Sequence, residues 1–363
     1  MISSTIRAAP LQKQSAPLAP LSTWPRYPLV SLLVAAWNEA AQIEAFLESF
    51  VALDYPNKEL ILCAGGTDQT LMLAKRWAGA QITILEQSAG AGKFRALQQC
   101  LPHATGALIV LTDADCILNQ ESFVRLIYPL VSGAATVTTG ALCPLQGQWQ
   151  MPFVVYQWAQ MHYAWCKALR SSTDSAFLVG GNAALLRPIV EEAYATALPM
   201  PVGEDTYLAL FALRAGHRIL RVSESTVETL FPQTLLTYIR QRSRWRRDQV
   251  LHAYRFGNRL IGWKALFSVC KHFIWLMLPL LPFILASIGM GLWGISIWSG
   301  IWLTTFAIYY HRYRVGMWEL ETIGDIKITD PLAWHLWKLI FADSCAVIHL
   351  AMCMVVPNWR YLW

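Results

Sequence analysis

LVSLLVAAWNEAAQIEAFLESFVAL, residues 29–53, joins a strand-like apolar run to a helical pattern, and this pairing decides the fold. Residues 29–37 are rich in Leu, Val and Ala, as in parallel strands that are covered on both faces. Apolar side chains then recur at the spacing of one helix face, at Ile43, Phe46, Leu47 and Phe50. Asn38 is the expected N-cap of this helix.

The same alternation of strand and helix continues to residue 115. The expected strands are KELILCAG (58–65), QITILE (81–86) and ALIVLTDAD (107–115), and the expected helices are TDQTLMLAKRWAG (67–79) and GKFRALQQCL (92–101). This spacing predicts an α/β fold, in which crossover helices connect the strands of a parallel sheet. Ligands of open parallel sheets bind at the carboxyl ends of the strands. Five polar residues fall there: Asn38, Glu39, Asp68, Asp113 and Asp115.

The composition favours contact with a lipid bilayer. Of the 363 residues, 55% are hydrophobic and 14% are charged, whereas charged residues make up about 25% of soluble domains. The stretch 273–310 contains no charge, and a crossing needs about 20 residues. We therefore expect two or three transmembrane spans, at about 273–290, 292–310 and 336–356. Residues 1–27, which are rich in Ala, Pro, Ser and Gln, are expected to form a flexible tail.

Charged residues near these spans indicate an orientation. Lys264 and Lys271 precede the first expected span, and Arg312 and Arg314 follow the second, so both flanks are assigned to the cytoplasmic side. The scattered cysteines, without a C-x-x-C pair, fit a reducing compartment. We expect an integral protein of the cytoplasmic (inner or plasma) membrane whose N-terminal domain faces the cytoplasm.

Two segments outside the expected spans also suggest a membrane interface. The basic run 240–264 indicates a patch that faces anionic head groups or phosphates rather than nucleic acid. The uncharged, aromatic stretch 149–166 is either a helix at the bilayer interface or a buried core helix. Asp343, inside the third expected span, is either a paired polar anchor or part of a substrate path.

Three short motifs carry chemistry. Asp113 and Asp115 stand two residues apart at a strand end, so their carboxylates project to the same side and could hold a divalent cation. Gly203-Glu204-Asp205 opens a helix, where acids either cap the helix or accept a proton from a hydroxyl. QRSRW, residues 241–245, sets a guanidinium that can bind phosphate beside an indole ring. Each motif alone also has a purely structural explanation.

The order of the motifs is more specific than any one of them. AAWNEA, GGTDQT, GAGKFRAL, LTDADC, VGGNAALLRP, VGEDTYLALFALRAGHRI and QRSRW together resemble the family-2 glycosyltransferases of the GT-A fold. The resemblance is to their membrane branch, which includes cellulose, chitin and hyaluronan synthases and ceramide glucosyltransferases, and it covers about residues 28–249. It implies a Rossmann-like GT-A domain over 28–237, basic amphipathic interface helices over 238–266 and a transmembrane region over 267–363.

The resemblance also implies a role for each matching residue. Asp205 would be the general base, with Glu204 beside it, and Asp115 together with Asp113 would hold Mg²⁺ or Mn²⁺. The nucleotide-sugar donor would be bound by Glu39, Asp68, Lys93, Asp113, Asp115, Gln241, Arg244 and Trp245. The acceptor entrance would be bordered by Gly180, Gly181 and Asn182. One departure concerns the donor: Ala64 stands where the family usually has an acid that recognises uracil, so a UDP-sugar is expected without its usual base contact.

The expected activity is therefore the transfer of a sugar from a nucleotide-sugar to a hydroxyl of a lipid or lipid-linked acceptor. A single base and a metal-bound leaving group imply direct displacement with inversion at the anomeric carbon. Two alternatives stay open: a subunit of a processive polysaccharide synthase, and a catalytically inactive membrane scaffold or transport component. The small number of expected spans speaks against a polymer channel within this chain.

Overall fold

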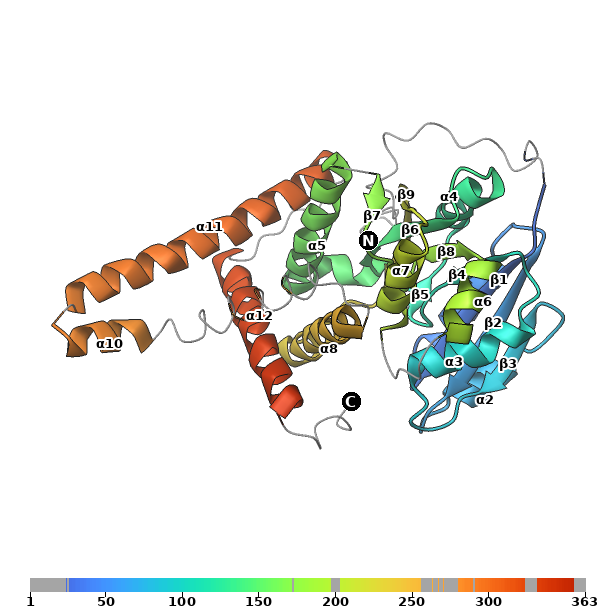
Figure 1. The fold of residues 1–363 in the computed structure, drawn as a ribbon, viewed down its shortest axis with the longest axis horizontal. Coiled ribbons are helices and arrows are strands. Elements are labelled where there is room, and N and C mark those ends of the chain that lie inside the picture. Colours follow the sequence, from blue (N-terminus) through green and yellow to red (C-terminus); the bar gives the residue numbers. More distant parts are fainter. Residues whose placement is uncertain are drawn as a thin grey trace, which may run out of the picture. The chain divides into compact units, whose positions relative to one another are not determined.

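Figure 1 shows the computed structural model, which describes residues 24, 26–171, 173–196, 203–255, 263, 267, 270, 280–289, 291–323 and 332–355. The chain forms two compact units. The first unit comprises residues 1–146 and 165–230, and the second comprises 147–164 and 231–363. Most of the expected N-terminal tail lies outside the described residues.

The first half of the sheet in the first unit is parallel, as the sequence predicts. Its strands lie in the order β3-β2-β1-β4 and are β1 (Val30–Trp37), β2 (Lys58–Gly65), β3 (Ile82–Glu86) and β4 (Leu108–Leu111). All pairs among them are parallel. The intervening helices are α1 (Ile43–Val51), α2 (Thr70–Lys75) and α3 (Gly92–Cys100), followed by a 3-10 turn at Leu101–His103. The carboxyl ends of these four strands therefore share one edge.

The second half of the sheet is mixed, and the sequence patterns did not predict its strands. Its strands are β8 (Ala183–Leu186), β6 (Val137–Pro144), β9 (Ile219–Thr229), β5 (Cys116–Ile117) and β7 (Asp174–Ser175). β8 is antiparallel to both β4 and β6, and β6 is parallel to β9. Leu111 pairs with Ala183, so the chain that leaves β4 runs beside the chain that enters β8. This register brings the Asp113 segment next to the Gly180–Gly181 segment.

Helices flank this mixed half in the sequence. They are α4 (Gln120–Val131), α6 (Arg187–Thr196) and α7 (Glu204–Arg214). Asn119 caps α4, because its side-chain oxygen accepts a hydrogen bond of 2.8 Å from the Ser122 amide. Gly203 precedes α7 with a φ of 76°, a left-handed conformation that glycine adopts without steric cost. The turn at Gly203 therefore sets the direction in which α7 begins.

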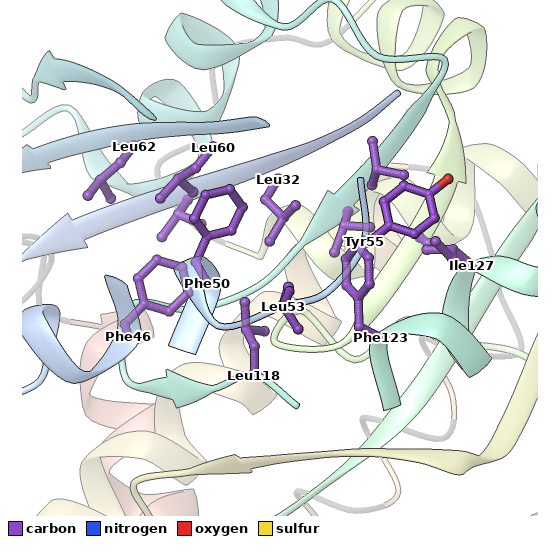
Figure 2. Close-up of a cluster of buried hydrophobic side chains, with 14 of the residues drawn as sticks. Leu32, Phe46, Phe50, Leu53, Tyr55, Leu60, Leu62, Leu118, Phe123 and Ile127 are labelled. Carbon is purple, nitrogen blue, oxygen red and sulfur yellow. The ribbon is translucent and has the colours of Figure 1, made fainter. Parts of the chain in front are cut away.

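A buried cluster holds the parallel strands to their helices (Figure 2). Phe46 and Phe50 of α1 lie against Leu32 of β1 and against Leu60 and Leu62 of β2, and all five are fully buried. The cluster continues through Tyr55 to Phe123 of α4, whose ring centre lies 5.7 Å from that of Tyr55. Each such side chain contributes about 1.5–3 kcal/mol through burial. The strand ends that carry the polar residues are thus anchored to a packed core.

The predicted N-cap is wrong. α1 begins at Ile43, and its N-cap residue is Gln42. Asn38 instead has a φ of 59°, and its side-chain oxygen accepts a hydrogen bond of 2.7 Å from the Thr67 amide. The chain therefore turns sharply at the end of β1 before the helix starts. Asn38 links the loops that follow β1 and β2.

The second unit is helical. It contains the first part of α5 (Pro152–Ser171), then α8 (Leu235–Arg255), α10 (Leu281–Ser287), α11 (Gly291–Ile323) and α12 (Leu332–Val355), and the 3-10 turn at Gln146–Gln150 leads into it. The aromatic side chains at the start of α5 are buried, and the ring of Tyr156 lies 4.7 Å from that of Tyr313 in α11. The described start of this segment is therefore a buried helix.

One described helix segment, Leu292–Met317 of α11, is long and apolar enough to cross a bilayer. It contains the second expected span, 292–310. Only part of the first expected span is described, and that part includes the seven-residue helix α10. The third expected span falls within α12, apart from Val356, which lies outside the described residues.

Candidate active site

Lys93 lies at the centre of the candidate site in the first unit. It stands in the first turn of α3, after Gly90 and Gly92, which both have a φ of 74°. Its Nζ lies 2.5 Å from Asp113 Oδ1, and it also forms an ion pair with Glu204. Burial alone would lower the pKa of Lys93, but the charges of Asp113 and Glu204 reverse this and raise the pKa well above its usual value. Lys93 is therefore a cation held between two acids from different segments.

Asp113 and Asp115 form an acidic group just beyond the end of β4. Their carboxylate oxygens and the Cys116 sulfur lie within 4.8 Å of one another. Burial, and then the charge of Asp113, raises the pKa of Asp115 to about 6. The Thr229 hydroxyl acts in the opposite direction through a hydrogen bond to Asp115. The charge of Asp113 thus acts on Asp115 at the carboxyl edge of the sheet.

The donor set of this group fits Mg²⁺ or Mn²⁺. These cations prefer oxygen ligands, which Asp113 and Asp115 provide. Cys116 adds a soft sulfur, but burial and the charge of Asp113 raise the pKa of its thiol well above the usual value. A neutral thiol is a poor ligand for a hard cation. Asp113 and Asp115 are therefore the two residues of this group that suit the metal.

Glu204 and Asp205 open α7 on the other side of Lys93. Glu204 is buried, with 5% of its surface exposed, and Asp205 is partly buried. Burial, and then the charge of Glu204, raises the pKa of Asp205 to about 7. The Asp205 carboxylate accepts a hydrogen bond of 2.6 Å from the Thr206 amide. Asp205 is thus a carboxyl group that can both hold and release a proton near neutral pH.

Two consecutive glycines connect the acidic groups. A Cβ on Gly180 would lie 3.3 Å from Asp205 Oδ2, and a Cβ on Gly181 would lie 3.2 Å from Asp113 Oδ2. The carbonyl of Gly181 is fixed by a hydrogen bond of 3.1 Å from the Thr112 hydroxyl. The backbone therefore passes close to both acids at positions where a side chain would crowd them.

Asn182, the third residue of this motif, has a buried side chain. Its side chain is 2% exposed and donates hydrogen bonds to the carbonyls of Ala141 (3.0 Å) and Ser225 (3.2 Å). The Ser225 hydroxyl donates to its side-chain oxygen in return. Asn182 thus connects β8 to β6 and β9 inside the sheet.

Glu39 and Asp68 lie in the loops that follow β1 and β2. The Glu39 amide donates to the Thr70 hydroxyl at 2.7 Å, and Asp68 accepts hydrogen bonds from Thr70 and from the Ala40 amide. The hydrogen bond from the Thr70 side chain is the main cause of a lowered pKa of Asp68. Both residues thus lie at the carboxyl edge of the parallel strands. The hydrogen bonds of Asp68 connect the loop after β1 to the loop after β2.

Two further polar residues at the site, Thr229 and Gln87, do not belong to any of the sequence motifs. Thr229 hydrogen-bonds to Asp115, and Gln87 is buried beside Gly65 with its side-chain oxygen unpartnered. Gln87 directly follows β3, a strand that the sequence predicts, so its position at the carboxyl edge of the sheet was predictable. Thr229 ends β9, a strand that the sequence patterns did not predict.

Gln241, Arg244 and Trp245 lie on α8 in the second unit. Arg244 is exposed, whereas Gln241 and Trp245 are partly buried. Between them, the Arg242 guanidinium lies over the rings of Tyr238 (4.9 Å) and Trp245 (4.7 Å). These residues share one helix with a cation–aromatic stack.

Asp343 of α12 anchors that helix. Its carboxylate accepts hydrogen bonds from the hydroxyls of Tyr238 (3.0 Å) and Tyr309 (2.7 Å). Its backbone carbonyl accepts a further hydrogen bond of 3.1 Å from Arg246. Asp343 is therefore the paired polar anchor, one of the two roles that the sequence left open.

Comparison with known proteins gives consistent matches. The family model described as glycosyltransferase like family 2 matches residues 25–247. An N-acetylglucosaminyltransferase from Azorhizobium caulinodans is 25% identical over 264 residues, which are 68% of this chain and 64% of that protein. A beta-monoglucosyldiacylglycerol synthase from Nostoc sp. is 33% identical over 107 residues, 28% of this chain and 23% of that protein. The chain thus spans less than two thirds of the length of these curated relatives.

A solved structure matches the fold over nearly the whole chain. The mannosyltransferase PcManGT from Pyrobaculum calidifontis, in complex with GDP-Man and Mn²⁺, superposes with a TM-score of 0.59 at 19% identity. The match covers 94% of this chain and 91% of that one. The sheet order and this likeness identify the fold as GT-A. The family model covers more than half of the residues of the chain. The chain therefore belongs to the family described as glycosyltransferase like family 2.

Proposed function

We propose that this glycosyltransferase moves a sugar from a nucleotide-sugar donor to a hydroxyl of a lipid or lipid-linked acceptor, with inversion at the anomeric carbon. The observation that carries the proposal is the gathering of Asp113, Lys93, Glu204 and Asp205 around one short stretch of backbone. This arrangement supplies a cation ligand, a phosphate partner and a proton acceptor within one cluster of side chains.

Asp113 and Asp115 are the residues that would hold Mg²⁺ or Mn²⁺. A cation bound there supplies positive charge that stabilises the departing nucleoside diphosphate. Lys93 adds a second positive charge on the same side of the site, within reach of Asp113. Both charges favour cleavage of the bond between the anomeric carbon and the diphosphate, because negative charge builds up on the leaving oxygen.

Asp205 is the residue that would accept the proton. Its raised pKa, about 7, lets the carboxylate exist at neutral pH and still bind a proton from the acceptor hydroxyl. The acceptor oxygen then attacks the anomeric carbon from the face opposite the diphosphate, the bond to the diphosphate breaks, and the configuration inverts. The proton remains on Asp205 until it passes to solvent, and no covalent bond to the protein forms.

The names of the relatives and the exposed apolar surface of the second unit support the proposed classes of donor and acceptor. Relatives named as an N-acetylglucosaminyltransferase and a beta-monoglucosyldiacylglycerol synthase support the transfer of glucose or N-acetylglucosamine and a lipid acceptor. The UDP carrier of the donor is what the family resemblance implies. Large apolar side chains on α10 and α11 are highly exposed: Phe283 (74%), Leu292 (84%), Trp293 (69%) and Leu303 (68%). A lipid surface would cover them. We propose the cytoplasmic membrane, with the active site on its cytoplasmic side.

Membranes that contain the protein, incubated with radiolabelled UDP-glucose or UDP-N-acetylglucosamine and Mn²⁺, test the proposal. Label that extracts into organic solvent is the expected result, and Asp205→Asn membranes serve as the control. Label in an insoluble or high-mass product would instead support the polysaccharide synthase. If neither these donors nor GDP-mannose give a labelled product above the control, the proposed transferase activity is refuted in favour of the inactive scaffold.

A further inference from the structure

Lys93 forms ion pairs with two acids, Asp113 and Glu204, that differ in burial and in their suitability as metal ligands. Glu204 is the more buried partner, with 7% of its side chain exposed, against 35% for Asp113. Asp113 is also one of the two carboxylates that suit a divalent cation. The same carboxylate therefore has two possible positive partners, the Lys93 ammonium and the metal. Glu204 has no such second role, because it is not part of the metal-ligand group Asp113, Asp115 and Cys116.

We propose that Lys93 competes with the divalent cation for Asp113, and that Glu204 is the positioning residue that retains Lys93 in the pocket when it leaves Asp113. The inference rests on the metal-dependent transfer proposed above and adds an order of events to it. Two positive charges at one carboxylate repel each other. Metal binding to Asp113 therefore requires the ammonium to withdraw.

The donor makes this exchange favourable. Its diphosphate brings negative charge that can accept the ammonium released from Asp113, while Glu204 keeps the lysine close. Donor and metal then assist each other's binding, a coupling that must be equal in both directions. Without nucleotide, the metal must displace Lys93 with no compensating partner, so its affinity is low. The lysine thus limits occupation of the metal site when no donor is bound.

Mn²⁺ binding to the purified full-length chain, followed by the electron paramagnetic resonance signal of free Mn²⁺ without nucleotide, tests the competition. Lys93→Met removes the competing charge, so we expect Mn²⁺ to bind about tenfold more tightly than to wild type, or better. Lys93→Arg keeps the charge, and its affinity should stay close to that of wild type. Lys75→Met is the matched control, since Lys75 is an exposed lysine 4.0 Å from Glu86.

Equal or weaker Mn²⁺ binding by Lys93→Met overturns the inference. Lys93→Gln, whose amide can donate to both acids, replaces it if the methionine variant does not fold. Repeating the titration with UDP separates the two proposals. Suppose that wild type binds Mn²⁺ in the presence of UDP, while Lys93→Met and Lys93→Gln bind it no more tightly than wild type in the absence of UDP. That result refutes the competition and leaves the proposed function standing. If wild type binds no Mn²⁺ even with UDP, the metal requirement of the proposed function fails, and the competition fails with it.

Discussion

The carboxyl of Asp205 has a single task in the proposed reaction, the acceptance of a proton. Asp205→Asn keeps the size of the side chain but cannot take the proton. We expect kcat to fall by about 10²–10⁴-fold, with little change in the KM for the donor. Steady-state kinetics with a labelled donor measures both constants. Asp174→Asn is the matched control, because Asp174 pairs with the exposed Arg218 at the surface; full turnover in Asp205→Asn would rule out the assignment.

The pKa of Asp205 also gives the reaction a pH dependence. Burial, and then Glu204, raises this pKa from 3.8 to about 7. Below pH 7 the carboxyl already holds a proton and cannot accept another. We therefore expect kcat/KM to fall about tenfold for each pH unit below 7 and to level off above it. Initial rates over a pH series with constant Mn²⁺ measure the profile, and a flat profile through pH 7 would contradict it.

The site acids were predictable because they stand at positions with a clear local signal. Asp113 follows a strand, and Asp205 opens a helix, and both belong to short motifs in a fixed order. The partners of Lys93 were not predictable, because its contact with Glu204 joins segments far apart in the chain. The burial of Asn182 was not predictable either: its sequence neighbours are at the site, but its side chain faces the interior of the sheet.

The strands of the parallel half were predicted, and those of the mixed half were not. β1 and β2 are apolar runs of eight residues, long enough to be distinguished from helix by their composition. β8 has four residues, and β5 and β7 have two each, which is too few for alternation to appear. The start of α1 was placed too early because an Asn before a helical pattern usually caps it, whereas Asn38 forms a left-handed turn.

The hydrogen bonds of Asn182 should matter for stability. Asn182→Ala leaves the carbonyls of Ala141 and Ser225 without these donors inside the sheet. Each unsatisfied buried group costs about 1–3 kcal/mol, so we expect a lower free energy of unfolding. Chemical denaturation followed by tryptophan fluorescence measures it. Asn57→Ala, which removes an exposed hydrogen bond to the Tyr27 carbonyl, should cost far less; equal losses would argue against the role of Asn182 in the sheet.

At the scale of the molecule, composition predicted an apolar C-terminal region but not the division of the chain. Residues 147–164 join the C-terminal helices in the second unit, although they lie within the range 28–237 that was predicted as the catalytic domain. The uncharged, aromatic character of this segment was visible in the sequence. Its partners, such as Tyr313, were not, because they come from the other end of the chain.

The proposed membrane insertion through α11 would make the protein sensitive to charge on that helix. Leu303, 68% exposed, lies within the apolar segment Leu292–Met317. A lysine near the centre of a span costs about 2.5–3.5 kcal/mol of insertion free energy. We therefore expect Leu303→Lys to increase the fraction released from membranes by alkaline carbonate. Leu213→Lys, at an exposed leucine of α7, is the control; unchanged retention of Leu303→Lys would contradict insertion of this helix.

The ion pairs of Lys93 also have a consequence for biosynthesis. As the chain leaves the ribosome, the parallel strands and α3 are complete well before Glu204 has been made. Until then, the lysine lacks its buried counter-ion, and closing that contact requires the chain between Lys93 and Glu204 to be ordered. Competence for metal and donor should accordingly arise late, when the nascent polypeptide has extended past α7, rather than with the strands that first define the fold.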